Sequence, residues 1–151
     1  MIAFQRKTNR LPGPSYEGNR ILSITLCCQN RRPLFTSADA VNYHLQILRP
    51  LLLKYKAILW AYCFMPDHVH FLIEGGSGKE ILDLVKLYKQ MTGYRYKQQT
   101  GQNLWQKSWI DHVLRREEDV GKVAYYILGN PERKGLVADW RKYPFLGSPL
   151  T

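Results

Sequence analysis

The chain has 151 residues, a length typical of one domain, and 45% of them are hydrophobic, so the sequence predicts a folded core. It contains no continuous apolar run long enough to span a membrane and no apolar leader of the kind found in signal peptides, so we expect a cytoplasmic protein. The 22 Lys and Arg residues outnumber the 12 Asp and Glu residues, and the net charge of +10 favours a polyanionic partner such as nucleic acid.

The first half of the chain predicts a basic arm, a strand, a helix and a hairpin. Residues 1–19 are basic and rich in turn-forming proline and glycine, which indicates a partly mobile arm. Alternating apolar residues, a capping serine and the turn sequence Met65-Pro66-Asp67 define the elements that follow. They are a strand at Arg20–Cys28, a helix from Ser37 to about Tyr55, and paired strands at Ala57–Phe64 and His68–Glu74.

The second half predicts a long basic helix, a strand and a final short helix. The segment from Lys79 to about Gln98 has the period of an amphipathic helix, with an apolar stripe formed by Ile81, Leu84, Val85, Tyr88 and Met91. A strand is expected within Leu104–Leu114. The last helix runs from Glu117 to about Leu128, and Asn130-Pro131 ends it. Its acidic first turn, Glu117, Glu118 and Asp119, suits the helix dipole.

This order of elements predicts an α+β fold. Without the last helix, β-α-β-β-α-β is the ferredoxin-like plan that RRM domains share, an antiparallel sheet with two helices on one face. The added C-terminal helix is expected to pack on or beside the open face of the sheet. We expect residues 1–151 to form a single domain.

The sequence His68-Val69-His70 places two imidazoles on one face of a strand. Residues two apart point to the same side, so these histidines share a face with Leu72 and Glu74. The alternate residues Val69, Phe71 and Ile73 should then be buried by the helices. Two imidazoles about 7 Å apart along a strand can converge on one divalent ion, although two unrelated surface histidines would give the same pattern.

The last predicted helix carries adjacent tyrosines that face different ways. At about 100° per residue, its apolar stripe consists of Val120, Val123, Ala124, Ile127 and Leu128. Tyr126 falls on the polar flank one turn after Lys122, whose ammonium would favour the nucleophilic phenolate. Asn130 offers an amide oxygen as a third, hard metal ligand. Alternatively, Tyr125 and Tyr126 simply pack or face solvent.

Taken together, these segments resemble the single-tyrosine HUH transposases (IS200-like), and most closely the subgroup of REP-associated tyrosine transposases. The resemblance covers roughly Arg20 to Ser148. It rests on FMPDHVHFLIE around the histidines, on LWQ at Leu104–Gln106, and on YILGNPERKGLV from Tyr126 to Val137. The later segment WRKYPFLGS matches the tail of the subgroup only loosely.

The resemblance implies an HUH endonuclease fold and a reaction that cuts and rejoins single-stranded DNA. By motif position, His68 and His70 hold Mg²⁺ or Mn²⁺ with Asn130 as the third ligand. Tyr126 then attacks the scissile phosphate, which gives a 5′-phosphotyrosine intermediate and a free 3′-hydroxyl. The implied substrates are hairpins of palindromic repeats. Relatives act as a monomer or as a homodimer, and both states stay open here.

Basic residues outside these motifs are candidates for contacts with the DNA backbone. They are Arg31 and Arg32 after the first strand, Lys86, Lys89, Arg95 and Lys97 on the long helix, Lys122 beside Tyr126, and Arg6, Lys7 and Arg10 in the arm. Trp105 and Trp109 are interpreted as core residues rather than as platforms for bases.

Three other functions are compatible with the sequence. A domesticated relative would bind hairpins without cutting them, although the candidate catalytic side chains are all present. A metal-dependent hydrolase that uses water would need His68 and His70 but not Tyr126. An RNA-binding module of the RRM type would read RNA with aromatic side chains on its central strands, where this chain displays histidines.

Overall fold

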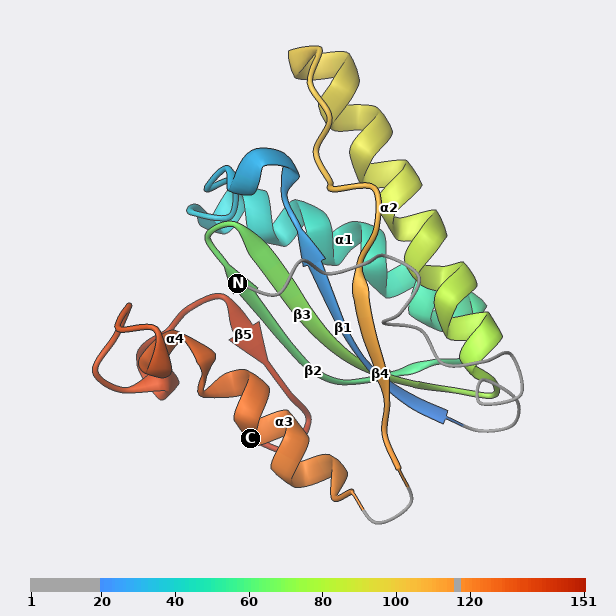
Figure 1. Cartoon of the computed structure of the whole chain (residues 1–151), viewed down its shortest axis with the longest axis vertical. Coiled ribbons are helices and arrows are strands. Elements are labelled where there is room, and N and C mark those ends of the chain that lie inside the picture. The colour runs from blue at the N-terminus through green and yellow to red at the C-terminus, as the bar shows by residue number, and fades with distance from the viewer. Residues whose placement is uncertain (1–19, 116–117) are drawn as a thin grey trace.

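The computed structural model describes residues 20–115 and 118–151, and it has a five-stranded antiparallel sheet at its centre (Figure 1). The basic arm predicted over residues 1–19 lies outside the described residues. The strands are β1 (Arg20–Cys27), β2 (Ile58–Met65), β3 (His68–Gly75), β4 (Ile110–Val113) and β5 (Leu146–Gly147). The helices are α1 (Ala38–Lys54), α2 (Gly78–Thr100), α3 (Val120–Leu128) and α4 (Asn130–Arg133), with short 3₁₀ turns at Gln29–Arg31 (η2) and Trp140–Lys142 (η3).

The strand order β4-β1-β3-β2-β5 confirms the predicted ferredoxin-like plan and adds one strand at its edge. β2 and β3 form the predicted hairpin, and β1 pairs with β3 along its whole length, from Arg20 opposite Gly75 to Cys27 opposite His68. The start of β3 therefore lies beside the end of β1 in the middle of the sheet.

Both long helices cover one face of the sheet, as predicted (Figure 1). Each begins at a serine whose hydroxyl accepts a backbone N–H, from Ala40 at Ser37 and from Glu80 at Ser77. The side chains of Val69, Phe71 and Ile73 are buried under these helices, which confirms the predicted inward face of β3. The opposite face of β3, with His68 and His70, is thus turned away from α1 and α2.

The third helix packs on the otherwise open face of the sheet and lies against β2 (Figure 1). Its predicted apolar stripe forms a second, smaller core: Ala124, Ile127 and Leu128 are buried with Cys63 and Leu72 of the sheet. This packing places the polar flank of α3 along the face that carries the histidines.

The last helix ends at Leu128, as predicted, but two other predictions about it were wrong. α3 begins at Val120 rather than at Glu117, because the Asp119 carboxylate caps it by accepting the N–H groups of Gly121 and Lys122. Glu117 lies outside the described residues. Pro131 does not end helical structure: α3 stops at Leu128, and Pro131 sits in the first turn of α4, where its missing N–H is tolerated.

The predicted apolar stripe of α2 also ends one turn early. Met91 is exposed, and Thr92 takes the core position beside it. The Thr92 hydroxyl donates to the Tyr88 carbonyl and accepts from Trp105 Nε1, so a polar residue is satisfied in the core. Trp105 and Trp109 both belong to this core, as expected.

The C-terminal segment extends the sheet through β5, which pairs with β2. Gly147 is required there, because a Cβ at this position would come within 2.7 Å of the Tyr62 ring. The Tyr143 hydroxyl donates to the Phe64 carbonyl at 2.6 Å, and the Ser148 hydroxyl donates to the Trp60 carbonyl. Among the described residues, no helix is both long and apolar enough to cross a membrane.

Candidate active site

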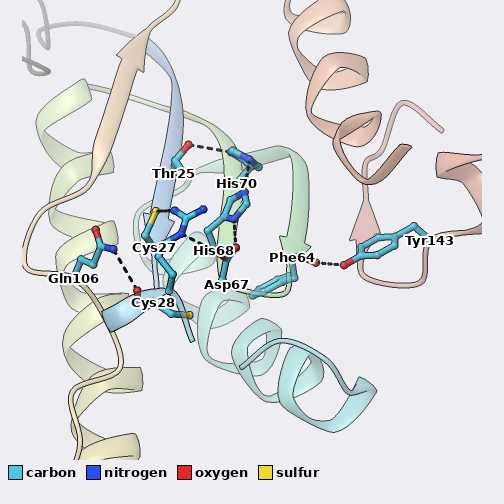
Figure 2. Close-up of polar contacts among 10 residues, drawn as sticks. Thr25, Cys27, Cys28, Phe64, Asp67, His68, His70, Gln106 and Tyr143 are labelled. Carbon is cyan, nitrogen blue, oxygen red and sulfur yellow. Dashed lines mark hydrogen bonds and ion pairs between the residues drawn. The ribbon is translucent and has the colours of Figure 1, made fainter. Parts of the chain in front are cut away.

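The two histidines of β3 meet at their Nε2 atoms on the face of the sheet next to α3. His68 Nε2 lies 3.1 Å from His70 Nε2, and the two rings are nearly perpendicular. Figure 2 shows that each ring is held from its other nitrogen. His68 Nδ1 is 2.6 Å from Asp67 Oδ1, and His70 Nδ1 is 2.9 Å from Thr25 Oγ1. Such outer contacts fix ring orientation in histidine metal sites.

The protonation states of these groups suit metal coordination. Burial lowers the pKa of His68 despite the carboxylate beside it, and burial together with His68 lowers the pKa of His70 to about 3. Burial opposes ionisation of Asp67, but the hydrogen bond to His68 and the Arg31 guanidinium outweigh it and lower that pKa. The ionised Asp67 therefore accepts a hydrogen bond from His68 Nδ1, which leaves Nε2 of His68 unprotonated and facing His70 Nε2.

A two-histidine site needs further ligands, and the described residues contain no cluster of three or more His, Cys, Asp or Glu side chains. Asn130, the first residue of α4, is buried and lines the same cavity as the two histidines. Its amide oxygen is a hard metal ligand, of the kind that binds Mg²⁺ and Mn²⁺ together with imidazole. The side chains present therefore fit a divalent cation with open coordination positions.

Tyr126 reaches this cavity from the polar flank of α3, and the residue is 66% exposed, compared with 48% for Tyr125. The Tyr125 hydroxyl instead donates to the Leu150 carbonyl, and its ring packs against Trp140. Winding of the helix thus separates the two tyrosines, as the sequence pattern indicates, and turns only Tyr126 toward the histidines.

The cation next to Tyr126 is Arg133 of α4. Its guanidinium carbon lies 3.7 Å from the centre of the Tyr126 ring. One of its nitrogens donates to the Tyr126 carbonyl at 2.6 Å and to Asn130 Oδ1 at 3.4 Å. Gly129 makes room for this arrangement, because a Cβ there would come within 2.9 Å of the guanidinium. Arg133 therefore joins the candidate nucleophile to the candidate third ligand.

These side chains surround one cavity of about 610 Å³. Arg31, Arg133 and Lys134 supply positive charge to its wall, and no carboxylate is among the described residues that line it. Arg31 is aimed there by a tight turn in which Asn30 and Arg31 both have positive φ, and it forms a 2.9 Å ion pair with Asp67 Oδ2. A cavity of this charge fits a phosphate group.

Only some of the basic residues that the sequence analysis proposed as DNA contacts line the cavity. Arg31 lines the cavity, whereas Lys122, Arg32, Lys86 and Lys89 are not among its lining residues. The guanidinium that packs on the Tyr126 ring belongs to Arg133, which the sequence analysis did not single out. Arg32 holds the η2 turn to the loop at Gln102 and Asn103.

Four residues of the site escaped the sequence analysis: Thr25, Asp67, Arg133 and Lys134. The adjacency of Asp67 to His68 was an available signal, because a carboxylate commonly orients a metal-binding histidine. Arg133 lies within the matched motif YILGNPERKGLV, but nothing in its spacing shows that it folds back onto Tyr126.

Comparison with known proteins adds a family and a fold. Residues 19–129 match the family described as "Transposase IS200 like", a range that contains the two histidines and Tyr126 but ends just before Asn130. A curated protein of Haemophilus influenzae, described as uncharacterized, is 23% identical over 158 residues, which cover 83% of this chain and 88% of that protein.

Two solved structures have the same fold. One is a REP-associated tyrosine transposase bound to a REP hairpin, with a TM-score of 0.66 and 18% identity over 97% of this chain and 82% of that chain. The other is described as a putative transposase from Deinococcus radiodurans, with a TM-score of 0.55 and 22% identity over 78% of this chain and 95% of that chain.

Proposed function

This chain belongs to the IS200-like transposase family, and from that premise we propose that it cuts and rejoins single-stranded DNA at hairpins through a transient 5′-phosphotyrosine bond. The observation that carries this proposal is the cavity shared by Tyr126, His68 and His70. A nucleophile, two convergent imidazoles and a cationic wall together provide what transfer of a phosphodiester requires.

We assign the cation to His68, His70 and Asn130, with Mg²⁺ or Mn²⁺ as the metal. When bound, this ion supplies Lewis-acid stabilisation of charge on the scissile phosphate. Asp67 and Thr25 hold the two imidazole rings so that both Nε2 atoms face one point. Thr25 can donate or accept a hydrogen bond, so it can accompany either neutral form of His70.

In the proposed reaction, the Tyr126 hydroxyl oxygen attacks phosphorus. A new bond forms between that oxygen and phosphorus, the bond from phosphorus to the 3′-oxygen breaks, and the 3′-oxygen leaves with a proton. The phenol loses its own proton in the same step. The 3′-hydroxyl of a second strand then reverses the reaction, so joining needs no external source of energy.

Arg133 has a positioning role in this scheme. Its guanidinium packs on the Tyr126 ring and also lines the cavity, so one side chain restrains the nucleophile and contributes positive charge near the phosphate. Arg31 supplies a second guanidinium on the histidine side. We propose that Arg133 and Arg31 bind the scissile phosphate from opposite sides.

DNA hairpins are proposed as the substrate because a structurally similar transposase is bound to a REP hairpin. Because Tyr126 and both histidines of one chain line one cavity, we also propose that the site is complete within a single chain. The net charge of +10 agrees with a polyanionic substrate.

A denaturing gel tests the reaction. The protein is mixed with end-labelled hairpins from its own genomic flanks and Mn²⁺, with EDTA in a parallel sample. We expect a covalent protein–DNA adduct that requires the cation, is absent in Tyr126→Phe and persists in the matched variant Tyr125→Phe. Cleavage without an adduct would indicate hydrolysis by water, and binding without either product would indicate a hairpin-binding protein that does not cut.

A further inference from the structure

A separate pocket lies between the first half of α1 and the second half of α2. Its volume is about 320 Å³, at the lower end of the range of about 300 to 1,000 Å³ that is usual for ligand sites. It shares no described lining residue with the candidate active site. We propose that this cavity, which we call the interhelical pocket, binds a neutral guanine ring, either as the free base or as its nucleoside.

The two helices line the pocket with polar residues, where packed helices usually carry apolar ones. Residues four apart lie on one face of a helix, so Asp39 and Tyr43 of α1 share a face, as do Arg95 and Gln99 of α2. The side chains of Asp39 and Gln99 have no hydrogen-bond or ion-pair partner among the described residues. The pocket therefore offers unused donors and acceptors, which favours a polar ligand over a purely hydrophobic one.

One wall of the pocket carries a buried histidine with an unpartnered nitrogen. His44 is 5% exposed and lines the pocket, and its Nδ1 lies 2.6 Å from the Tyr88 hydroxyl. Burial lowers the pKa of His44 to about 3, so the ring is neutral. Because Tyr88 is fully buried and Nδ1 is the acceptor beside its O–H, the ring proton of His44 lies on Nε2. Nε2 has no hydrogen-bond partner among the described residues, so it can donate to a ligand.

Two tyrosine rings give the pocket flat walls. Tyr43 and Tyr96 both line it, one from each helix. The guanidinium carbon of Arg95 lies 4.5 Å from the centre of the Tyr43 ring, and that of Arg32 lies 5.6 Å from the centre of the Tyr96 ring. Cation–π contacts of this kind hold the two rings in place. Aromatic and guanidinium planes are the surfaces on which unpaired bases stack, so the pocket fits a flat heterocycle.

The charged side chains of the pocket select guanine among flat heterocycles. The carboxylate of Asp39 can only accept hydrogen bonds and the guanidinium of Arg95 can only donate them, so the ligand must present donors and acceptors on its edges. Guanine presents N1–H and N2–H₂ as donors to a carboxylate, and O6 and N7 as the acceptors that arginine prefers. Because one negative and one positive side chain face the ligand, the pocket favours a ring without net charge.

A free base or nucleoside suits the pocket better than a base of the DNA substrate. The carboxylate of Asp39 repels phosphates, and no lysine is among the described residues that line the pocket. The pocket lies between the two helices that cover one face of the sheet, whereas His68 and His70 lie on the other face (Figure 1). A strand held at the histidines would therefore have to pass around the sheet to place a base here.

Calorimetric titration of the full chain with guanosine and with inosine tests the pocket, because inosine differs from guanosine only by lacking the 2-amino group. Metal and DNA are left out, so the result does not depend on the proposed reaction. We expect the wild type to bind guanosine about 10-fold more tightly than inosine, as one hydrogen bond to a charged group implies. Asp39→Asn should remove most of this preference, because the amide is uncharged. The matched control Asp83→Asn makes the same change on α2 outside the pocket and should retain the preference.

A second variant, Arg95→Gln, should weaken binding of both nucleosides by about 10-fold and leave their ratio unchanged, because O6 and N7 are common to both. A wild-type protein that binds neither nucleoside would overturn the proposal, as would equal affinities for the two or a preference that survives in Asp39→Asn. A single-stranded oligonucleotide that contains guanine should not displace guanosine. Displacement would mean that the pocket takes a base of DNA and would contradict a free ligand.

Discussion

Asp67 accepts a hydrogen bond from His68 Nδ1 at 2.6 Å while its second carboxylate oxygen pairs with Arg31, so one carboxylate orients both a candidate metal ligand and a cavity cation. Asp67→Asn keeps an oxygen that can accept from His68 Nδ1 but removes the negative charge, so it should weaken Mn²⁺ binding about 10- to 100-fold in calorimetric titrations without DNA, because the carboxylate makes the His68 ring a more basic ligand. Arg31→Gln is the control, since it leaves the contact with His68 intact. Equal Mn²⁺ affinity in Asp67→Asn and wild type would argue against a metal site at these histidines.

Arg133 gives a second prediction, because it contacts the Tyr126 ring and carbonyl at once. Arg133→Gln should slow adduct formation at saturating DNA and Mn²⁺ by about 100-fold, a loss typical of removing one preorganised charge from a reacting phosphate. Arg133→Lys should recover only part of the rate, since an ammonium cannot stack and donate in the same geometry.

Lys134→Gln provides the matched comparison for Arg133, because Lys134 lines the same cavity and the loss of charge is equal. We expect it to reduce DNA affinity with little change in the rate at saturation. If both variants slow the single-turnover rate equally, the contribution of Arg133 is general charge and not the position of Tyr126. Circular dichroism of each variant checks that α3 and α4 are intact.

The sequence predicted the parts of the site that depend on local periodicity. Strand alternation placed His68 and His70 on one face, and helical winding separated Tyr126 from Tyr125, because both patterns are set by neighbours in the chain. The contact between Thr25 and His70 joins residues 45 positions apart and depends on the register of β1 against β3. No pattern within either strand specifies that register, so Thr25 escaped prediction.

The positions of the arginines were unpredictable for a different reason. Arg31 and Arg32 are adjacent, yet the positive φ values of Asn30 and Arg31 send the first to the cavity and the second to the loop at Gln102 and Asn103. Pro131 lies in the first turn of α4 and does not begin a non-helical loop. Arg133 reaches Tyr126 because it belongs to this short helix. The direction of a long side chain on such a turn depends on the backbone φ and ψ angles of the turn. Residue propensities for helix, strand or turn do not predict these angles.

The completeness of the site within one chain can be tested by mixing two inactive variants. Tyr126→Phe lacks the nucleophile, and His68→Ala lacks a metal ligand. Because Tyr126 and His68 of the same chain line one cavity, we expect the mixture to form no adduct beyond the sum of the separate variants. Recovery of adduct in the mixture would mean that α3 is exchanged between chains and would contradict the proposed monomeric site.

His44 gives a prediction about stability rather than activity. Its ring is buried between α1 and α2 among Phe35, Phe64 and Trp105, and Nδ1 lies 2.6 Å from the Tyr88 hydroxyl. Burial lowers the pKa of His44 from 6.5 to about 3, so the folded protein holds this ring neutral. The free energy of unfolding is therefore undiminished by His44 above pH 6.5 and decreases as the pH falls toward 3. In this range His44 is protonated in the unfolded chain but stays neutral in the folded chain.

Unfolding by urea between pH 6 and pH 4 measures this effect against a His44→Gln variant. Carboxylates and the other histidines titrate in both proteins, so the difference between the two isolates His44. The free energy of unfolding of the wild type should fall more steeply with acid, by about 1.4 kcal/mol per pH unit, which corresponds to one extra proton bound on unfolding. The variant should be less stable at pH 7 and should approach the wild type near pH 4. Parallel pH profiles would show that His44 is protonated in the folded state and would contradict its burial as a neutral ring.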